Sequence, residues 1–211
     1  MRRSRSEIRV LVILSAGFAV LFLLPGFTPG GGTASSSSRT PRGIATGREV
    51  AITFDDLPGV SVAGGDAAER PAAQDLAWAA MTRRLLEALV RARVPVVGFV
   101  NSGKLVRDGS AVPARTELLR SWRDAGFELG NHTAGHVDRH RVPLAEFEAD
   151  VVSGETAVQA LEDETSGAKR LRWFRHPFLH TGRTLEEKRA LESFLAQRGY
   201  RIAPVTIDNS E

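Results

Sequence analysis

The sequence predicts an α/β protein built on a parallel β-sheet, and three observations lead to that class. The 211 residues are 42% hydrophobic and 25% charged, a composition that is typical of about one globular domain and excludes a disordered or fibrous chain. From Glu49 onward, short apolar runs alternate with amphipathic stretches, which is the pattern of β/α units. The chain has no sequence repeat, so it is not a solenoid.

Five short apolar runs are the predicted strands, and four amphipathic stretches between them are the predicted helices. The strands fall at residues 50–54, 94–100, 127–130, 171–174 and 201–207. The helices fall at residues 74–93, 116–125, 144–164 and 184–198, where apolar residues recur at helical spacing. Gly126 follows the second helix as a stop signal. The last helix has the clearest ends, because Thr184 and Glu187 make a capping box and Gly199 ends it.

Residues 1–27 have the features of an export signal. Four arginines precede an uncharged run at residues 10–24. That run is shorter than the roughly 17–25 residues of a spanning helix, but residues 25–27 bring it to the edge of that range, so a retained membrane anchor is the alternative to a cleaved signal peptide. Residues 28–47 are rich in Gly, Ser, Thr and Pro and are the predicted linker to a folded domain at 48–211. We therefore expect a periplasmic or extracellular protein, either free or anchored by its N-terminus.

The charge and the cysteine content exclude several classes of function. The formal net charge is +3, and the arginines of residues 1–34 supply that surplus, which leaves a neutral body. A neutral body argues against a nucleic-acid partner. A membrane contact is expected only through the N-terminal segment, if that segment is not cleaved. The chain has no cysteine, so disulfides, thiolate metal sites and thiol nucleophiles are excluded. Any metal must be bound by histidine and carboxylate.

Polar residues follow four of the predicted strands at the point where each strand ends. They are Asp55 and Asp56 after the first strand, residues 131–136 after the third, residues 175–178 after the fourth and Asp208 after the fifth. In a parallel β/α sheet or barrel, the carboxyl ends of the strands converge on one face, where the active sites of such folds are built. We therefore expect these groups to meet at one site.

His132 and His136 are the candidate metal ligands of this set. Their spacing of four places both imidazoles on one side if residues 133–136 form a helical turn. An aspartate from another strand would complete a His-His-Asp site with open coordination positions. Such a site suits zinc and can also bind other divalent metals.

The other histidines receive different interpretations. His176 and His180 have the same spacing of four, but Pro177 favours an extended backbone at His176. Extended residues four apart are too distant to share one ion, so we assign this pair a structural or substrate-facing role. His140 is expected at the surface.

Asp55 and Asp56 are predicted to divide two tasks between them. Adjacent residues at a strand end point in different directions, so one carboxylate can bind the metal while the other faces the bound water. The metal lowers the pKa of that water toward about 7, and the free carboxylate accepts its proton as general base. Arg175 is the candidate to orient that base through a bidentate contact.

Three motifs carry a resemblance to a known family. They are Thr53-Phe54-Asp55-Asp56, His132-Thr133-Ala134-Gly135-His136 and Arg175-His176-Pro177-Phe178. In order and spacing they resemble the motifs of the polysaccharide deacetylase family, the NodB-homology domain of carbohydrate esterase family 4. The resemblance runs from Glu49 to the end of the sequence. It implies a distorted (β/α) barrel and the metal-dependent removal of acetyl groups from N-acetylated sugars, or sometimes from O-acetylated ones.

The resemblance also implies roles for the residues of these motifs. Asp55 would be the catalytic base, and the metal ligands would be Asp56, His132 and His136. The backbone N–H near Phe178, next to Pro177, would help to bind the oxyanion, a role that needs no particular side chain. Phe178 stands where the family often has tyrosine.

The C-terminal part of the sequence departs from the family pattern. Residues 208–211 resemble the fourth motif, which gives Asp208 a catalytic role, but Glu211 stands in place of the usual aspartate. The fifth motif, which carries the family's catalytic acid, has no counterpart. Five strands are also fewer than such a barrel needs. We therefore expect the sequence to be a C-terminally truncated piece of a longer enzyme, which ends after about five β/α strands.

Three functions stay open at this point. The first is a metal-dependent deacetylase that acts on an N-acetylated glycan. The second is a non-catalytic carbohydrate-binding relic that keeps a metal but lacks the acid. The third is a hydrolase of the same fold that acts on small ureide or cyclic imide amides. Expected export toward the cell envelope favours the glycan.

Overall fold

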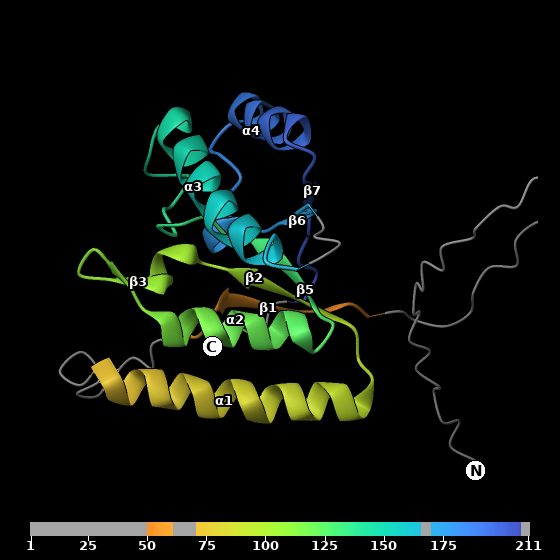
Figure 1. Ribbon diagram of the computed structural model, residues 1–211. Coiled ribbons are helices and arrows are strands. Elements are labelled where there is room, and N and C mark those ends of the chain that lie inside the picture. Colours follow the sequence, from red (N-terminus) through yellow and green to blue (C-terminus); the bar gives the residue numbers. More distant parts are fainter. Residues whose placement is uncertain (1–49, 61–70, 166–169, 208–211) are drawn as a thin grey trace, which may run out of the picture. The chain divides into compact units, whose positions relative to one another are not determined.

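The computed structural model of the protein describes residues 50–60, 71–165 and 170–207 (Figure 1). These residues fold around a sheet in which the strands lie in the order β1-β2-β5-β6-β7, and neighbouring strands pair in parallel. The strands are β1 (Ile52–Leu57), β2 (Val96–Val100), β5 (Glu128–Asn131), β6 (Trp173–Phe174) and β7 (Arg201–Ile202). The predicted α/β class with a parallel sheet is confirmed, and each predicted strand region contributes one strand.

The α-helices of the described chain cover both faces of the sheet. They are α1 (Pro71–Ala92), α2 (Pro113–Asp124), α3 (Leu144–Glu162) and α4 (Leu185–Gln197), and each matches a predicted helix. In Figure 1, α1 and α2 lie below the sheet, and α3 and α4 lie above it. The predicted cap of α4 is present, because the Thr184 hydroxyl oxygen accepts a hydrogen bond from the Glu187 N–H at 3.1 Å.

Two short features that follow β2 are not predicted by the hydrophobic pattern. A 3-10 turn, η2 (Ser102–Leu105), and a hairpin of β3 (Val106–Arg107) and β4 (Ser110–Ala111) follow β2. Both are too short for a periodic apolar pattern, although Asp108-Gly109, with φ angles of 50° and 75°, is a sequence signal for a tight hairpin turn. β7 is also shorter than the predicted strand at 201–207, because Pro204 has no N–H to donate to a neighbouring strand.

β1 and β7 form the two edges of the sheet among the described strands, so closure into a distorted barrel stays a prediction. The predicted leader at 1–27, the predicted linker at 28–47 and the candidate residue Asp208 lie outside the described residues. Within the described part of the chain, no helix has both the length and the hydropathy needed to cross a membrane.

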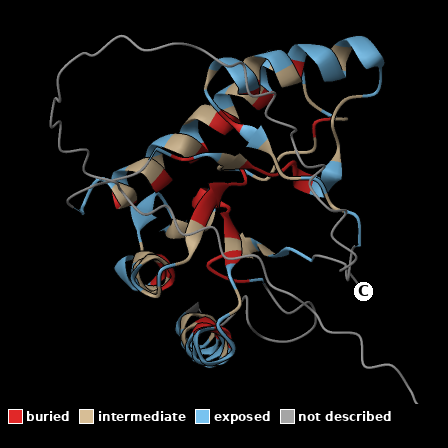
Figure 2. Ribbon diagram, turned by 90° about the vertical axis from the view of Figure 1, so that its right-hand side faces the viewer, coloured by how far each residue is buried: buried red, intermediate tan, exposed pale blue. Residues whose placement is uncertain are grey.

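The core lies between the sheet and the helices that pack on it. Figure 2 shows buried residues, in red, on the strands and on the inward sides of the helices. Phe147 of α3 meets Phe174 of β6 edge to face, with 6.4 Å between the ring centroids. Trp122 of α2 meets Phe54 of β1 in the same way at 5.6 Å. These contacts hold helices of both faces against the strands that carry the polar motifs.

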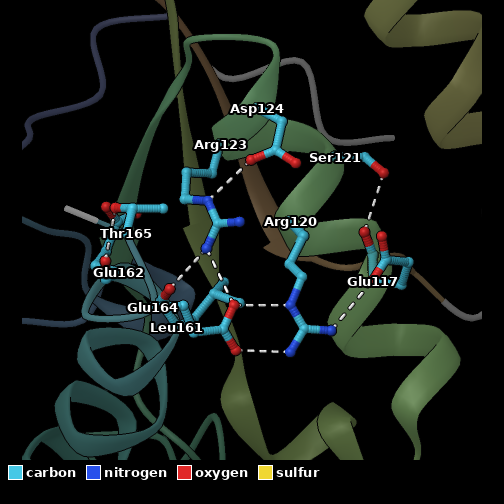
Figure 3. A network of polar contacts seen from close by, with 9 residues as sticks. All are labelled: Glu117, Arg120, Ser121, Arg123, Asp124, Leu161, Glu162, Glu164 and Thr165. Atoms are coloured by element: carbon cyan, nitrogen blue, oxygen red, sulfur yellow. Dashed lines mark hydrogen bonds and ion pairs between the residues drawn. The ribbon is translucent and has the colours of Figure 1, made fainter. Parts of the chain in front are cut away.

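A network of exposed charges joins the end of α3 to α2. Glu164, which follows α3, accepts hydrogen bonds from Arg120 and Arg123 of α2, with N–O distances of 2.6 to 3.2 Å (Figure 3). The Arg120 hydrogen bonds are the main cause that lowers the pKa of Glu164 to about 2. Because exposed ion pairs contribute little to stability, the network fixes the position of this turn more than it stabilises the fold.

Candidate metal centre and active site

A β-bulge in β1 places the two adjacent aspartates. The register of β1 against β2 shifts between Phe54 and Leu57, so that Asp55 and Asp56 together lie opposite the single residue Phe99. Bulges of this kind re-aim side chains, and Asp56 has a left-handed φ of 65°. The predicted position of the pair after the strand is therefore wrong. β1 continues through both aspartates because the buried Leu57 resumes the ladder with β2.

The bulge directs the two carboxylates to different partners. Asp55 Oδ2 accepts a hydrogen bond from Arg175 Nη1 at 3.1 Å. Asp56 Oδ1 lies 2.8 Å from Lys104 Nζ and 3.7 Å from His136 Nε2. The two neighbouring carboxylates therefore belong to two separate sets of contacts.

Asn131, the last residue of β5, fixes the loop that carries His132 and His136. Its side-chain amide is fully buried and donates to the Val151 carbonyl at 2.9 Å and to the Tyr200 hydroxyl at 3.0 Å. Its side-chain oxygen accepts the Thr133 N–H at 2.8 Å. The loop is thereby tied to α3 and to the start of β7.

The predicted helical turn at residues 133–136 is wrong. Thr133 and His136 have left-handed φ angles of 66° and 52°, and the His136 N–H donates to the Thr133 hydroxyl oxygen at 3.1 Å. A threonine hydroxyl competes in this way with helical hydrogen bonds. The imidazoles of His132 and His136 still converge, with 4.9 Å between the ring centroids.

Gly154 of α3 allows this loop to lie directly against the helix. A Cβ atom at Gly154 would stand 2.5 Å from Asn131 Oδ1 and 2.7 Å from the Thr133 carbonyl carbon. Gly154→Ala is therefore expected to destabilise the fold by about 1–3 kcal/mol, because the backbone of Thr133 must move. In an unobstructed helix the same substitution stabilises by roughly 0.5–1 kcal/mol. Urea unfolding measures the difference.

Ser153→Ala is the matched control for this prediction, because Ser153 is the exposed neighbour of Gly154 on the same helix. That substitution is expected to leave stability close to the wild-type value. A Gly154→Ala protein as stable as the wild type would contradict the close packing of the loop.

Asp56, His132 and His136 form a cluster that can bind a metal ion. Their donor atoms all lie within 4.8 Å of one another. His132 Nδ1 lies 2.8 Å from the Arg175 carbonyl oxygen, which can only accept, so Nδ1 carries the proton and Nε2 keeps its lone pair. Burial lowers the pKa of His132 and favours the neutral imidazole, which is the form that binds metals. Two imidazoles and one carboxylate fit a divalent ion such as zinc and leave coordination positions open.

Lys104 is a further residue of the site, and the motifs do not include it. Its ammonium nitrogen lies 2.8 Å from Asp56 Oδ1 and 3.1 Å from the Asp56 carbonyl oxygen. Burial acts to raise the pKa of Asp56, but Lys104 and the two histidines outweigh it and hold that pKa below its usual value. Lys104 lies in η2, just after β2. Its position after a predicted strand is the feature of the sequence that could have identified it as a site residue.

Arg175 ties Asp55 to the sheet. Its side chain is 4% exposed, and its guanidinium lies over the Phe99 ring, 4.7 Å from the centroid. Nη1 donates to Asp55 Oδ2 and Nη2 donates to the Thr53 hydroxyl, each at 3.1 Å. The predicted bidentate contact is wrong, since the second nitrogen, Nη2, donates to the Thr53 hydroxyl instead of to Asp55. The two bonds together still fix the direction of the Asp55 carboxylate.

Phe178 forms a wall beside the cluster of Asp56, His132 and His136. It belongs to η3 (Pro177–Leu179), which follows β6, and it has a left-handed φ of 55°. Its ring stands edge-on to His136 with 4.6 Å between centroids, and the residue is 55% exposed. An exposed ring in this place offers an apolar surface to a substrate. The oxyanion role of the backbone at Pro177 and Phe178 stays a prediction.

The remaining histidines divide between the core and a second cluster. His176 is buried and extended, with φ −71° and ψ 128°, as Pro177 predicts. His140 is half-buried, and its ring stacks on His180 with 3.8 Å between centroids.

Replacing His176 by phenylalanine is expected to make the fold less sensitive to acid. Burial lowers the pKa of His176 from 6.5 to about 4, and neither ring nitrogen has a hydrogen-bond partner in the described part of the chain. Between these pH values the unfolded chain binds a proton that the folded chain does not. The contribution of neutral His176 to the free energy of unfolding is therefore fully present above about pH 6.5. It is lost as the pH falls toward 4, and the loss is about 3 kcal/mol at most.

The measurement is urea unfolding of both proteins at about pH 7.5 and about pH 4.5. The wild type is expected to lose more stability than His176→Phe between these conditions. An equal loss in the two proteins would show that His176 does not carry this pH dependence.

Several solved structures are similar to this chain. A family 4 carbohydrate esterase from Streptomyces lividans, in complex with acetate, is 21% identical at a TM-score of 0.48, and the match covers 74% of this chain and 61% of that one. The peptidoglycan deacetylase PdaC from Bacillus subtilis is 21% identical at a TM-score of 0.46, with 73% and 56% covered. BA3943, a family 4 pseudoenzyme from Bacillus anthracis, is 16% identical at a TM-score of 0.48, with 72% and 41% covered. The chain thus spans less than two thirds of the length of each.

The family model that matches this chain describes polysaccharide deacetylases. It matches residues 42–194, which include the two aspartates of the bulge, the histidine pair and Arg175. No curated protein matches the chain. On the family match, this chain belongs to the polysaccharide deacetylase family.

Proposed function

We propose that this chain is a metal-dependent hydrolase that removes acetyl groups from N-acetylated sugars of a polysaccharide. One observation carries the proposal. The cluster of Asp56, His132 and His136 lies beside a separate carboxylate, Asp55, whose direction is fixed by Arg175. Metal-assisted hydrolysis of an amide uses a Lewis acid, which the cluster would hold, and a general base, which Asp55 offers.

Zinc is the proposed metal, and Asp56, His132 and His136 would hold it. The donor set supports this choice, because His132 keeps its Nε2 lone pair and two imidazoles with one carboxylate form a typical catalytic zinc site. When bound, the ion supplies Lewis-acid chemistry, since it lowers the pKa of water and polarises the acetyl carbonyl.

The other residues of the site would act directly on water and substrate. Asp55 would accept a proton from the water that attacks the acetyl carbon. That proton would then pass to the leaving nitrogen as the C–N bond breaks, which gives acetate and a free amine. Arg175 keeps the Asp55 carboxylate aimed at that water. Phe178 gives the sugar an apolar surface beside His136. The backbone N–H groups near Pro177 and Phe178 would stabilise the oxyanion.

The location of the protein is part of the same proposal. Residues 1–27 would direct export and, if they are retained, anchor the chain in the membrane. The substrate would then be an N-acetylated glycan of the cell envelope. A cleaved leader would release the enzyme into the periplasm or the extracellular space.

The experiment that tests this function is an assay of acetate release. The full chain is loaded with Zn²⁺ and given oligomers of N-acetylglucosamine, before and after treatment with a chelator. A small ureide and a cyclic imide are tested in parallel. Acetate release that stops with the chelator and returns with Zn²⁺ is the expected result.

Two outcomes would overturn the proposal. Ring opening of the imide or cleavage of the ureide, without acetate release, would establish a hydrolase of small amides. No turnover by a folded, zinc-loaded chain that still binds the oligomers would establish a carbohydrate-binding relic.

A further inference from the structure

A second cluster of donor atoms lies near Phe178, apart from the first. The side chains of Asp138, His140 and His180 offer donor atoms that all lie within 4.8 Å of one another. Asp138 Oδ1 lies 2.7 Å from His180 Nδ1 and accepts the backbone N–H of His140 at 2.8 Å. The cluster combines the loop after His136 with the segment after η3, so it is separate from the three residues of the first cluster.

The hydrogen bonds of His140 leave one of its ring nitrogens free to bind a cation. Its Nε2 lies 3.1 Å from the Gly182 carbonyl oxygen, which can only accept, so Nε2 carries the proton. Nδ1 of the neutral ring therefore keeps its lone pair. Histidines that bind metals commonly donate their other N–H to a backbone carbonyl in this way.

His180 has a lone pair as well. Its Nδ1 donates to the Asp138 carboxylate, so Nε2 of the neutral ring is unprotonated, and the residue is partly exposed to solvent. The rings of His140 and His180 are nearly parallel, at an angle of 13° with 3.8 Å between centroids. The two rings therefore lie close together in the cluster.

The surroundings of the cluster leave it open to an ion. The Asp138 side chain is 16% exposed and that of His180 is 37% exposed, so water can reach both. Arg141 Nε lies 3.4 Å from Asp138 Oδ2, but the Arg141 side chain is 82% exposed and is free to turn away. The backbone is fixed, because the Arg141 N–H donates to the Asp138 carbonyl at 2.8 Å and the His180 N–H donates to the Pro177 carbonyl at 3.1 Å.

We propose that Asp138, His140 and His180 form a second binding site for a divalent cation of the zinc type. One carboxylate and two imidazoles are ligands that Zn²⁺ prefers. Tetrahedral ligands at about 2.1 Å from zinc lie about 3.4 Å apart, so the cluster contracts on binding through rotation of the exposed His180 ring. The ion would join the loop that carries His136 to the segment that carries Phe178.

The Phe178 ring contacts a histidine of each cluster. The Phe178 ring centroid lies 4.6 Å from that of His136 and 5.9 Å from that of His180. A cation at the second site would therefore hold the Phe178 wall in place next to the first cluster.

The test is the number of Zn²⁺ ions that the full chain binds, measured by elemental analysis after dialysis. The wild type is expected to bind two ions. Asp138→Asn and His180→Phe each keep the size of the side chain and are expected to bind one. His132→Gln, which removes a donor of the first cluster, is also expected to bind one. Circular dichroism confirms that each variant is folded, and a Co²⁺ titration of the wild type, followed by absorbance, is expected to show two binding steps.

The outcomes separate this proposal from the proposed function. One ion that is kept by Asp138→Asn and His180→Phe and lost from His132→Gln would overturn the second site and leave the first. One ion that is lost from Asp138→Asn and kept by His132→Gln would support the second site and overturn the first. A single Co²⁺ step in a wild type that binds one ion only at the first cluster would also overturn the second site.

Discussion

Asp55→Asn is expected to lower the rate of acetate release by about 10²- to 10⁴-fold while the protein keeps its metal. This range is the usual contribution of a general base. Asp55 lies outside the cluster of Asp56, His132 and His136, so its charge is not needed to hold the ion. Asparagine keeps the size of the side chain and can still accept a hydrogen bond from Arg175. The measurement is kcat for N-acetylglucosamine oligomers together with the zinc content of each protein.

The control for this variant is Asp108→Asn, which removes one carboxylate from the exposed turn between β3 and β4. It is expected to retain the wild-type rate. A normal rate in Asp55→Asn would show that another group accepts the proton. Loss of the ion from Asp55→Asn would show that this residue is a ligand instead.

His132→Gln is expected to weaken zinc binding by more than about 100-fold and to abolish activity at micromolar zinc. Residues that only support a metal ligand already cost about 10- to 100-fold in affinity when they are changed, and His132 offers its own Nε2 lone pair. The side chain is 2% exposed, so water does not replace it readily. Competition with a coloured zinc chelator measures the affinity.

His176→Gln is the matched control, because His176 is a buried histidine of the neighbouring strand end that belongs to neither donor cluster of the described residues. It is expected to bind zinc as the wild type does. If His132→Gln kept its affinity, or if both variants lost it equally, the assignment of His132 as a ligand would be wrong.

The strands and helices could be predicted because their apolar patterns are long enough to identify the type of each element. The run at 94–100 becomes β2 with buried Phe99 and Val100, and the stripe through α3 buries Phe147, Val151 and Val158. The residues of the motifs could be placed at one site because they lie within or just after the carboxyl ends of strands of one parallel sheet. Their roles in metal binding and catalysis stay predictions.

What the sequence could not predict depends on local backbone geometry and on single contacts. The bulge at Asp55 and Asp56 results from pairing with β2, which alternation along one strand does not encode. The bends at Thr133 and His136 result from a threonine hydroxyl that replaces helical hydrogen bonds. The contact of Lys104 with Asp56 joins η2 to β1 across 48 positions of the sequence, and no spacing rule describes it.

The Lys104 contact also has a consequence for metal binding. The ammonium group and the ion would compete for the same oxygen, Asp56 Oδ1, which lies 2.8 Å from Lys104 Nζ and 3.7 Å from His136 Nε2. A bound ion would therefore displace Lys104 from this oxygen. The Lys104 side chain is 25% exposed in its contact with Asp56, so the freed ammonium group can turn toward solvent.

The position of zinc in crystals of the full chain tests the central claim most directly. Anomalous scattering at the zinc edge is expected to show an ion about 2.1 Å from a carboxylate oxygen of Asp56, from His132 Nε2 and from His136, with Lys104 turned away from Asp56. Crystals grown with zinc that show no ion among these three residues, and that keep the ion pair of Lys104 with Asp56, would contradict the claim.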